Sequence, residues 1–237
     1  MLGLSLFAAA PVGASQPVPV ATLQPEALTR TDTAVRADSV RLIVSLQART
    51  LWAIAGGDTI RTMSIAVASG NVLRHGAQRW RFVLPLGGHT VRAKRVDPIW
   101  TPPDWHYVEE ARANHLRLQV LPQAGIRLRD GRRLLVRDSM VGLLTQGDDY
   151  FNALPIDEHI VFDGKLFIPP VASLNRRLAG ALGKFALDLG DGYLLHGTRD
   201  LQSIGSASTH GCIRLADDDL LWVFEHTPVG ARVVVRK

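Results

Sequence analysis

The chain has 237 residues, which suits one large domain or a domain with an insertion, since two equal domains would each be small. Hydrophobic residues make up 46% and charged residues 21%, as in a globular protein with a core, and no apolar run is long enough to predict a transmembrane helix. The net charge of +5 is scattered without a basic stripe or a nucleic-acid motif, which argues against a DNA- or RNA-binding protein.

The N-terminal segment has the composition of an export signal followed by a linker. Leu2 to Ala10 form a short apolar run, and the small residues at 12–14 suit cleavage by a signal peptidase. No Lys or Arg precedes Arg30, so a disordered apolar tail is the alternative interpretation. Residues 15–38 are rich in Pro, Ser, Thr and Ala. The sequence therefore predicts a signal segment at 1–14, a flexible linker at 15–38 and an exported protein of the periplasm or the cell-wall space.

The region after the linker predicts β structure. Short apolar runs between turn residues predict strands over 41–46, 50–54 and 59–67, with turns at 47–49 and 56–58. Two further strands are predicted over 80–83 and 90–94, on either side of a turn at Gly87 and Gly88.

The middle of the chain is less regular. Three prolines argue against regular helix or central strand over 98–105. Residues 107–118 have helical composition, and residues 126–136 predict a hairpin with Asp130 and Gly131 in its turn. Residues 138–165 give mixed signals and no prediction. Trp100, Trp105 and Tyr107 are interpreted as a small satellite core in preference to the wall of a substrate groove.

The last part of the chain returns to strands. Residues 184–195 predict two strands separated by the turn at 190–192. Asp217 is predicted to cap a helix that runs to about Glu225, and a final strand is predicted over 231–235. Most predicted elements are strands and the helices are short, so the sequence favours a mainly β architecture.

One cysteine carries the chemical argument. Cys212 is the single cysteine of the chain, so it forms no intramolecular disulfide and is either a small buried residue or a functional thiol. A thiol near its ordinary pKa of about 8.5 is mostly protonated at neutral pH and needs a base or a positive charge beside it. His196 ends an apolar strand, and the loop that follows is long enough to bring Cys212 back against it.

The residues around Cys212 fit acyl-transfer chemistry. Backbone amides near Gly211 and Cys212 are suited to an oxyanion hole, because glycine lets the chain turn its N–H groups toward a substrate. Arg214 points the same way as Cys212 in an extended chain, and its guanidinium is suited to hold a substrate carboxylate. His210 shares a face with Cys212 as well, so spacing alone leaves His196 and His210 open as the base.

A metal site is the rival interpretation of the same residues. It would use His196, His210, Cys212 and His226. Their spacing matches no usual zinc pattern, and neither a second cysteine nor clustered carboxylates complete it. No metal and no other cofactor is therefore predicted.

The segment from His196 to Arg214 resembles the signature of the YkuD family of L,D-transpeptidases. That signature has a histidine, a loop of about a dozen residues, then Ser or Thr, His, Gly, Cys, a hydrophobic residue and Asn or Arg, and here it reads His196, Thr209, His210, Gly211, Cys212, Ile213, Arg214. The resemblance covers residues 40–96 and 180–237, and 97–179 looks like an insertion. It implies a YkuD-like β-sandwich or barrel catalytic domain over 39–237, with short helices and an inserted α+β segment at about 97–179.

The resemblance also implies roles for individual residues. Cys212 matches the nucleophile, His196 the general base, and Gly197 the position whose carbonyl orients the histidine ring. Gly211 and Cys212 match the oxyanion-hole amides, and His210 shapes that loop. Arg214 and Thr209 match substrate-binding positions. In place of the family's Thr-Pro-x-Gly turn, the chain has a Leu84-Pro85-Leu86-Gly87 sequence, which lacks the threonine.

The implied activity is peptidoglycan L,D-transpeptidation. The enzyme would attack a tetrapeptide stem, release its terminal D-residue, and pass the acyl group from a cysteine thioester to an amine acceptor, in cell-wall cross-linking or anchoring. The partners implied are stem peptides and a stem, a lipoprotein lysine or a free D-amino acid as acceptor. Two alternatives remain open: an L,D-carboxypeptidase or cross-link hydrolase that uses the same acyl-enzyme, and a wall-binding module that has lost catalysis.

Overall fold

The computed structural model describes residues 40–145, 147 and 150–237 of the chain. The predicted signal segment at 1–14 and the linker at 15–38 lie outside the described residues. Within the described part, no helix is long and apolar enough to cross a membrane.

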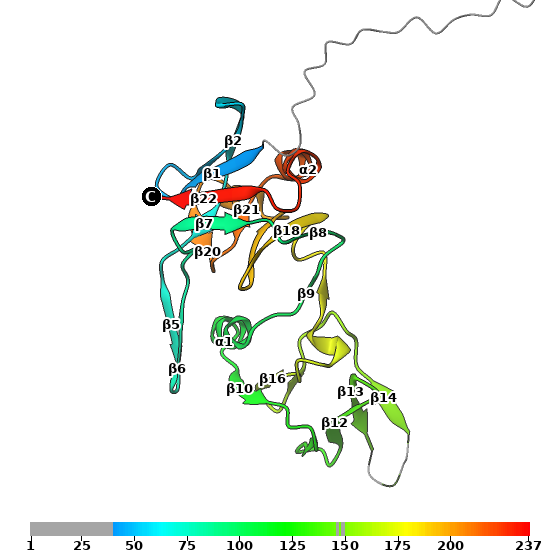
Figure 1. Ribbon diagram of the computed structural model, residues 1–237. Coiled ribbons are helices and arrows are strands. Elements are labelled where there is room, and N and C mark those ends of the chain that lie inside the picture. The colour runs from blue at the N-terminus through cyan, green and yellow to red at the C-terminus, as the bar shows by residue number, and fades with distance from the viewer. Residues whose placement is uncertain (1–39, 146, 148–149) are drawn as a thin grey trace, which may run out of the picture. The chain divides into compact units, whose positions relative to one another are not determined.

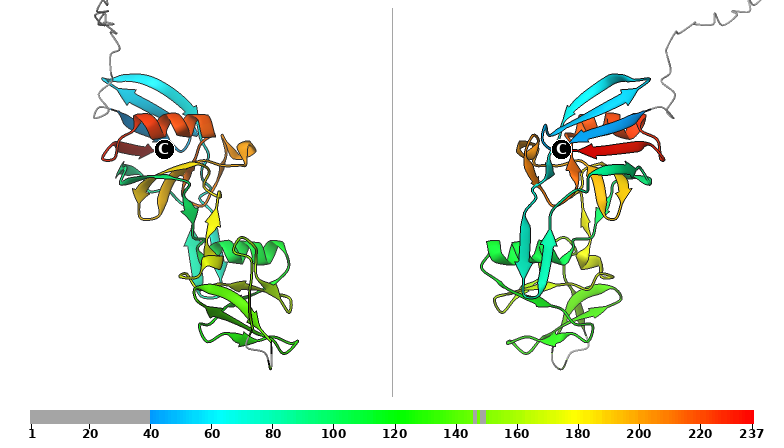
Figure 2. Two further views of the ribbon diagram at one scale, coloured as in Figure 1. Left: turned by 90° about the vertical axis from the view of Figure 1, so that its right-hand side faces the viewer. Right: turned by 60° about the vertical axis from the view of Figure 1, so that its left-hand side comes forward.

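A five-stranded sheet forms the first layer (Figures 1 and 2). Its strand order is β3-β2-β1-β22-β7. Their bounds are Asp58–Ser64 for β3, Thr50–Ala55 for β2, Arg41–Ser45 for β1, Arg232–Arg236 for β22 and Gly87–Thr90 for β7. Leu42 and Val44 alternate with outward-facing residues along β1 and are fully buried. That period of two places one face of the sheet on the core.

A four-stranded sheet forms the second layer, in the order β21-β19-β18-β8. Its strands are Ile213–Arg214 (β21), Tyr193–His196 (β19), Phe185–Gly190 (β18) and Ala93–Val96 (β8). Helix α2 (Asp217–His226) packs on β18 and buries Leu220 and Val223. Asp217 to Asp219 lie in its first turn, where carboxylates favour the helix dipole.

The two sheets share one hydrophobic cluster. It joins Leu42 and Val233 of the first sheet to Leu187 and Leu195 of the second, and it includes Leu220 of α2. Two mainly antiparallel sheets packed over a common core make a β-sandwich. The mainly β architecture predicted from the sequence is therefore confirmed.

The long segment between β8 and β18 begins and ends at paired strands, so its two ends lie side by side. β8 pairs with β18, and just beyond them β9 (Ile99–Trp100) pairs with β17 (Leu178–Ala179). Between these paired ends the chain forms one helix, a three-stranded sheet, a four-stranded sheet and a short 3-10 helix (Figure 1). The elements are α1 (Asp104–Ala113), β10 (Arg117–Val120), β11 (Ile126–Arg127), β12 (Arg133–Arg137), β13 (Met140–Leu144), β14 (Phe151–Ala153), β15 (Val161–Phe162), β16 (Lys165–Ile168) and Leu174–Arg176.

This segment has hydrophobic clusters of its own. One of them, the satellite cluster, contains Tyr107 and Ala111 of α1 with Leu166 and Ile168 of β16. Arg176 fixes the start of α1, because its buried guanidinium donates to the Pro102 carbonyl at 2.9 Å and also pairs with Asp104. Helix α1 is therefore held firmly at its N-terminal end.

Two strand pairs and a 3-10 turn complete the described chain. The hairpin of β5 (Val72–His75) and β6 (Gln78–Arg81) projects from the sandwich on the side where α1 lies (Figure 1). β4 (Val67–Ala68) pairs in parallel with β20 (Ala207–Thr209), and a 3-10 turn spans Leu201–Ser203.

Several predicted boundaries were wrong. Gly87 and Gly88 lie in strand β7 and not in a turn, because their backbone pairs with β22 at the edge of the sheet. The helix predicted over 107–118 is Asp104–Ala113: Pro103 just before it costs no hydrogen bond, and the chain from Arg117 pairs with β16.

Two further details differ from the sequence prediction. The strand predicted over 59–67 stops at Ser64 and resumes at Val67. Asp217 is the first helical residue of α2 and not its cap. The N-cap is Ala216, whose methyl side chain cannot accept a hydrogen bond.

Candidate active site

A cavity of ≈ 690 Å³ brings together six of the seven site residues predicted from the sequence. We call it the Cys212 cavity. The six are His196, Thr209, His210, Gly211, Cys212 and Arg214. The opposite wall includes Trp105, His106, Glu109 and Glu110 of α1, together with Trp80 of β6 and Trp100 of β9. The seventh residue, Gly197, lies behind His196.

Parallel pairing of β19 and β21 brings the cysteine and the histidine together. Leu195 pairs with Ile213 and His196 with Arg214, so Cys212 immediately precedes β21, the strand next to the one that carries His196. Leu195 and Ile213 are fully buried in the main core. Strands anchored by such residues hold the functional side chains beside them in fixed positions.

The His196 ring is held in one tautomer. Its Nδ1 lies 2.7 Å from the Gly197 carbonyl oxygen. Because a carbonyl oxygen only accepts, Nδ1 carries the hydrogen, and in the neutral ring Nε2 is left with the lone pair. The histidine is 5% exposed, so the ring has little freedom to turn.

Close packing against the Asp217 side chain and the Gly183 backbone explains why residue 197 is a glycine. A Cβ atom added there would lie 2.6 Å from Asp217 Oδ1, and one added at Gly183 would lie 2.8 Å from the Gly197 Cα. Gly183 also has φ of +73°, a conformation that side chains disfavour. The Gly183 backbone therefore supports the Gly197 peptide from behind and helps to place its carbonyl.

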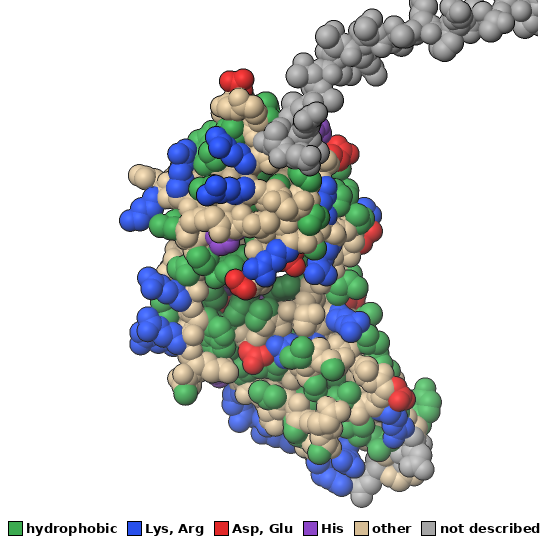
Figure 3. Space-filling model, in the orientation of Figure 1, with side chains coloured by type: hydrophobic (Ala, Val, Ile, Leu, Met, Phe, Trp, Pro, Cys, Tyr) green, Lys and Arg blue, Asp and Glu red, His purple; other side chains and the backbone are tan. Residues whose placement is uncertain are grey.

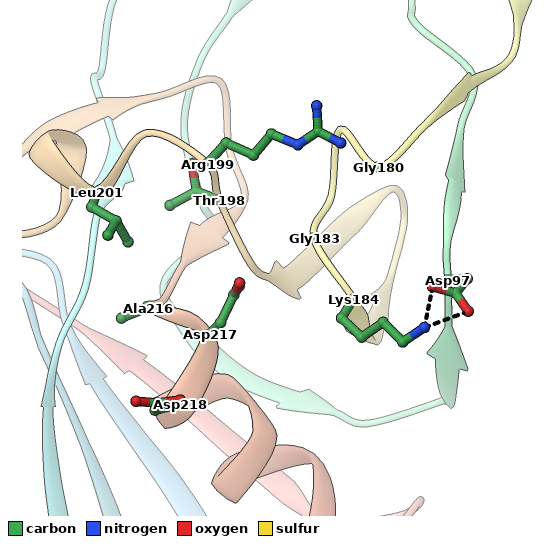
Figure 4. A pocket seen from close by; sticks show the side chains of 10 residues that line it. All are labelled: Asp97, Gly180, Gly183, Lys184, Thr198, Arg199, Leu201, Ala216, Asp217 and Asp218. Atoms are coloured by element: carbon green, nitrogen blue, oxygen red, sulfur yellow. Dashed lines mark hydrogen bonds and ion pairs between the residues drawn. The ribbon is translucent and has the colours of Figure 1, made fainter.

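A second hollow, with a volume of ≈ 650 Å³, lies beside Gly183 and Asp217 and is shown in Figure 4. Gly183 and Asp217 line it, together with Arg199. The ion pair between Lys184 and Asp97 closes one side, with its Nζ 2.8 Å from Oδ1. The hollow contains neither Cys212 nor His196 among its described lining residues, so it is separate from the Cys212 cavity.

Burial dominates the protonation of the cysteine and the histidine. It lowers the pKa of His196 to about 4, against a smaller opposite effect of the Gly197 hydrogen bond. Burial also raises the pKa of the Cys212 thiol, although the side chain keeps some exposed surface, and the Leu194 backbone and Arg214 oppose this only in part. At neutral pH both groups are therefore neutral, Cys212 as the thiol and His196 as the imidazole.

The loop before Cys212 is held by Thr209. Its hydroxyl donates to the Cys212 carbonyl at 2.6 Å and accepts from the Gly211 amide at 3.3 Å. Thr209 is 1% exposed, so the residue predicted to bind substrate has its hydroxyl engaged inside the loop. Gly211 has φ of +141°, and an added Cβ would lie 3.2 Å from the Tyr193 ring, which explains the glycine.

His210 faces α1 and not the sandwich core. Its ring stacks on Trp105 with centroids 4.0 Å apart, and its Nε2 lies 2.8 Å from Glu109 Oε2. Phe82 packs edge-on against the same ring. Burial lowers the pKa of His210, an effect that Glu109 partly offsets. His210 therefore ties the cysteine loop to α1.

The α1 residues of this cavity carry no motif and were not assigned to the site from the sequence. Glu109 lies in the segment predicted to be helical, whereas Trp105 lies in the proline-rich stretch 98–105, where no regular helix was predicted; the helix in fact begins at Asp104. The satellite core predicted from Trp100, Trp105 and Tyr107 divides in two: Tyr107 is buried in the satellite cluster, whereas Trp100 and Trp105 line the Cys212 cavity.

Arg214 supplies positive charge to the cavity. It lies across the strand pair from His196 and lines the same cavity. Its charge adds to the effect of burial in lowering the pKa of His196, and it partly opposes the effect of burial in raising the pKa of Cys212. Among the described residues no carboxylate pairs with its guanidinium, which is half-buried. No group of three or more His, Cys, Asp or Glu residues within the described ranges is placed to hold a metal ion.

Comparison with known proteins assigns the family. The profile of the L,D-transpeptidase catalytic domain (YkuD) matches residues 39–235, which is most of the chain. The chain belongs to this family, as the resemblance in the sequence implied.

The matches to individual curated relatives are local. The protein called "Probable L,D-transpeptidase ErfK/SrfK" of Salmonella typhimurium is 43% identical over 54 residues, which cover 23% of this chain and 18% of that protein. "Probable L,D-transpeptidase YbiS" of Escherichia coli is 44% identical over 52 residues, which cover 22% of this chain and 17% of that protein. The chain thus spans less than a fifth of the length of these relatives.

Solved structures give a looser likeness. An L,D-transpeptidase from Mycobacterium smegmatis aligns with a TM-score of 0.45 at 16% identity, covering 84% of this chain and 59% of the other. The family assignment rests on the profile match.

Proposed function

We propose that this chain is a peptidoglycan L,D-transpeptidase in which Cys212 is the nucleophile and His196 is the general base. One observation carries the proposal. A neutral histidine, held with its Nε2 lone pair available, lines the same cavity as the only thiol of the chain, and the two residues come from neighbouring strands or their ends. Imidazole next to thiol is the arrangement that activates a cysteine for acyl transfer.

The first half-reaction forms a thioester. His196 Nε2 takes the Cys212 proton as Sγ attacks the carbonyl carbon of the L-centre in a tetrapeptide stem. Because burial disfavours both the thiolate and the imidazolium, we place proton transfer together with attack and not before it. The imidazolium then gives its proton to the nitrogen of the departing D-residue, and the C–N bond breaks.

The second half-reaction runs the same steps in reverse with a new amine. The acceptor amine attacks the thioester carbonyl, neutral His196 takes its proton, and the C–S bond breaks with return of a proton to Cys212. The acceptor is another stem peptide, a lipoprotein lysine or a free D-amino acid. No cofactor enters either step.

Backbone amides and Arg214 provide the remaining chemistry. We assign the oxyanion hole to the amides of Gly211 and Cys212, where the 3.3 Å bond from the Gly211 amide to Thr209 is long enough to yield to an oxyanion. We assign Thr209 and His210 to holding this loop, and not to contact with substrate. Arg214, without a carboxylate partner among the described residues, is assigned to a carboxylate of the donor stem.

The domain boundaries and the location belong to the same proposal. We infer that residues 39–237 form one catalytic domain with an insertion at about 97–179. Residues 1–14 would direct export to the periplasm or the cell-wall space and 15–38 would act as a linker. These assignments rest on composition and on the position of the β9–β17 pair.

The test is incubation of the protein with purified tetrapeptide muropeptides, followed by identification of the products by mass. A cross-linked dimer or a D-amino-acid exchange product is expected, with loss of the terminal D-residue from the donor. Tripeptide products alone would assign the chain to L,D-carboxypeptidase chemistry. No product from any donor would contradict the proposal and favour a wall-binding module.

A further inference from the structure

Positive charge is segregated in one part of the sequence. From Thr59 to Val96 there is no Asp or Glu, although seven Arg and Lys residues lie there: Arg61, Arg74, Arg79, Arg81, Arg92, Lys94 and Arg95. Four of them pack against the sandwich. Arg61 pairs with Asp219, Arg95 pairs with Asp188, Lys94 lies over Phe224, and Arg92 lies against Gly190.

The other three belong to the β5–β6 hairpin. Arg74 lies directly opposite Arg79 in the antiparallel register, and Arg81 lies opposite Val72. Side chains alternate between the two faces of a hairpin, so Arg74, Arg79 and Arg81 share one face. All three are exposed, and among the described residues no carboxylate pairs with any of them. Figure 3 shows blue side chains on the edge where Figure 1 places this hairpin.

The opposite face of the hairpin borders the Cys212 cavity. Leu73 and Trp80 form a cross-strand pair on that face; both are half-buried, and Trp80 lines the cavity. Arg112, near the end of α1, donates to the carbonyl of Arg74 and so brings a fourth guanidinium to the hairpin. The arginine face is therefore the outer side of a wall whose inner side faces the site.

Such a face is unfavourable without an external anion. Like charges directly opposite each other on paired strands destabilise a hairpin, and neighbouring carboxylates would normally relieve the repulsion. We propose that Arg74, Arg79 and Arg81 bind the carboxylates of intact peptidoglycan, beside the stem that occupies the Cys212 cavity. This inference rests on the proposed function and extends it from a single stem peptide to the polymer.

The position and spacing of the arginines favour this partner. Residues two apart on a strand are about 6.6 Å apart, so Arg79 and Arg81 present charges in a row. A network of stem peptides carries repeated carboxylates next to whichever stem is being processed. An anionic membrane fits less well, because on the arginine face Val72 is the single large apolar side chain that β5 and β6 expose.

The experiment measures binding without turnover. In a Cys212→Ala background, sedimentation with purified sacculi compares the parent with the hairpin variant, Arg74→Gln/Arg79→Gln/Arg81→Gln. A control variant, Arg41→Gln/Arg129→Gln/Arg177→Gln, removes the same charge from exposed arginines elsewhere. We expect the hairpin variant to lose about tenfold in affinity at low salt, less at physiological salt, and the control to stay within about twofold.

Two further arms identify the partner. In the first arm, the carboxylates of the sacculi are converted to neutral amides. The affinity of the parent for these amidated sacculi should fall to that of the hairpin variant for untreated sacculi. Vesicles of phosphatidylglycerol and phosphatidylcholine test the membrane. Equal losses in the two triple variants, no loss in the hairpin variant, unchanged binding to amidated sacculi, or a loss confined to vesicles would each overturn the inference. Turnover of soluble muropeptides is measured separately with the wild-type protein, which retains Cys212. Failure of the proposed enzymatic function can therefore be distinguished from failure of the arginine face to bind sacculi.

Discussion

The two walls of the Cys212 cavity are built in different ways. On one side, His196 and Cys212 stand on or beside strands whose neighbours Leu195 and Ile213 are fully buried in the main core. On the other side, α1 packs on the separate satellite cluster, within a segment that leaves and rejoins the sandwich beside the β9–β17 pair.

This difference suggests that the strand wall and the helix wall have different roles. Groups that must meet a substrate within a fraction of an ångström belong on a rigid element, and the strand wall provides one. On the helix wall, Trp105 stacks on the His210 ring and Glu109 lies within hydrogen-bonding distance of it. We infer that the strand wall performs the chemistry and the helix wall shapes the loop and the cavity.

The largest effect is expected from removing the thiol. Cys212→Ala should abolish product formation from tetrapeptide muropeptides, because no other cysteine exists to form the thioester. Circular dichroism and the thermal midpoint should stay close to those of the wild type, since the side chain is only partly buried. Substantial turnover by this variant would remove Cys212 from the mechanism.

A smaller but still large effect is expected from the backbone behind His196. Gly183→Ala should lower kcat by about tenfold to a hundredfold, because its Cβ would press on Gly197 and shift the carbonyl that holds the imidazole. Gly164→Ala is the matched control, with φ of +69° and nothing within 4 Å of an added Cβ. Both variants should lose about 1–2 kcal/mol of stability through the positive φ.

Activity separates the two glycine variants. If Gly164→Ala lost as much kcat as Gly183→Ala, the effect would come from general destabilisation and not from the position of His196.

The buried histidine should also make stability depend on pH. The pKa of His196 is about 4 in the folded protein and 6.5 as its ordinary value, so protonation favours the unfolded chain. Its contribution is complete above about pH 6.5 and is lost as the pH falls toward 4, with a total of about 3 kcal/mol. Urea unfolding across this range should show a steeper loss in wild type than in His196→Gln, whose side chain stays neutral. Parallel curves would show that His196 is not buried in its neutral form.

The smallest effect is expected from the helix wall. Glu109→Gln keeps a hydrogen-bonding group next to His210 but removes its charge, so kcat should fall by less than about tenfold and the limbs of the pH profile should not move. Glu110→Gln, one residue further on α1 and 4.0 Å from His159, is the control and should be closer to wild type. A displaced pH limb in Glu109→Gln would place His210 in proton transfer.

The strand wall could be predicted from the sequence because its residues lie close together along the chain. His196 and the segment from Thr209 to Arg214 flank one loop, and His196 directly follows the strands predicted over 184–195. The short strands β20 and β21, which carry Thr209 and Arg214, were not predicted. The helix wall could not be predicted, since Trp105 and Glu109 are about a hundred residues from His210 and no local pattern links them. The same limit applies to Gly87 and Gly88, whose strand exists only because β22 lies beside it.

The pH dependence of Cys212 alkylation by iodoacetamide tests most directly whether His196 of the strand wall, and not His210, is the base. In wild type the rate should still be rising above about pH 8.5, because burial raises the pKa of the thiol. His196→Ala should change this profile and slow alkylation near neutral pH, because it removes the base proposed to accept the thiol proton, whereas His210→Ala should keep the wild-type profile. If His210→Ala shifts the apparent thiol pKa and His196→Ala leaves it unchanged, the base lies on the helix side of the cavity and the account is wrong.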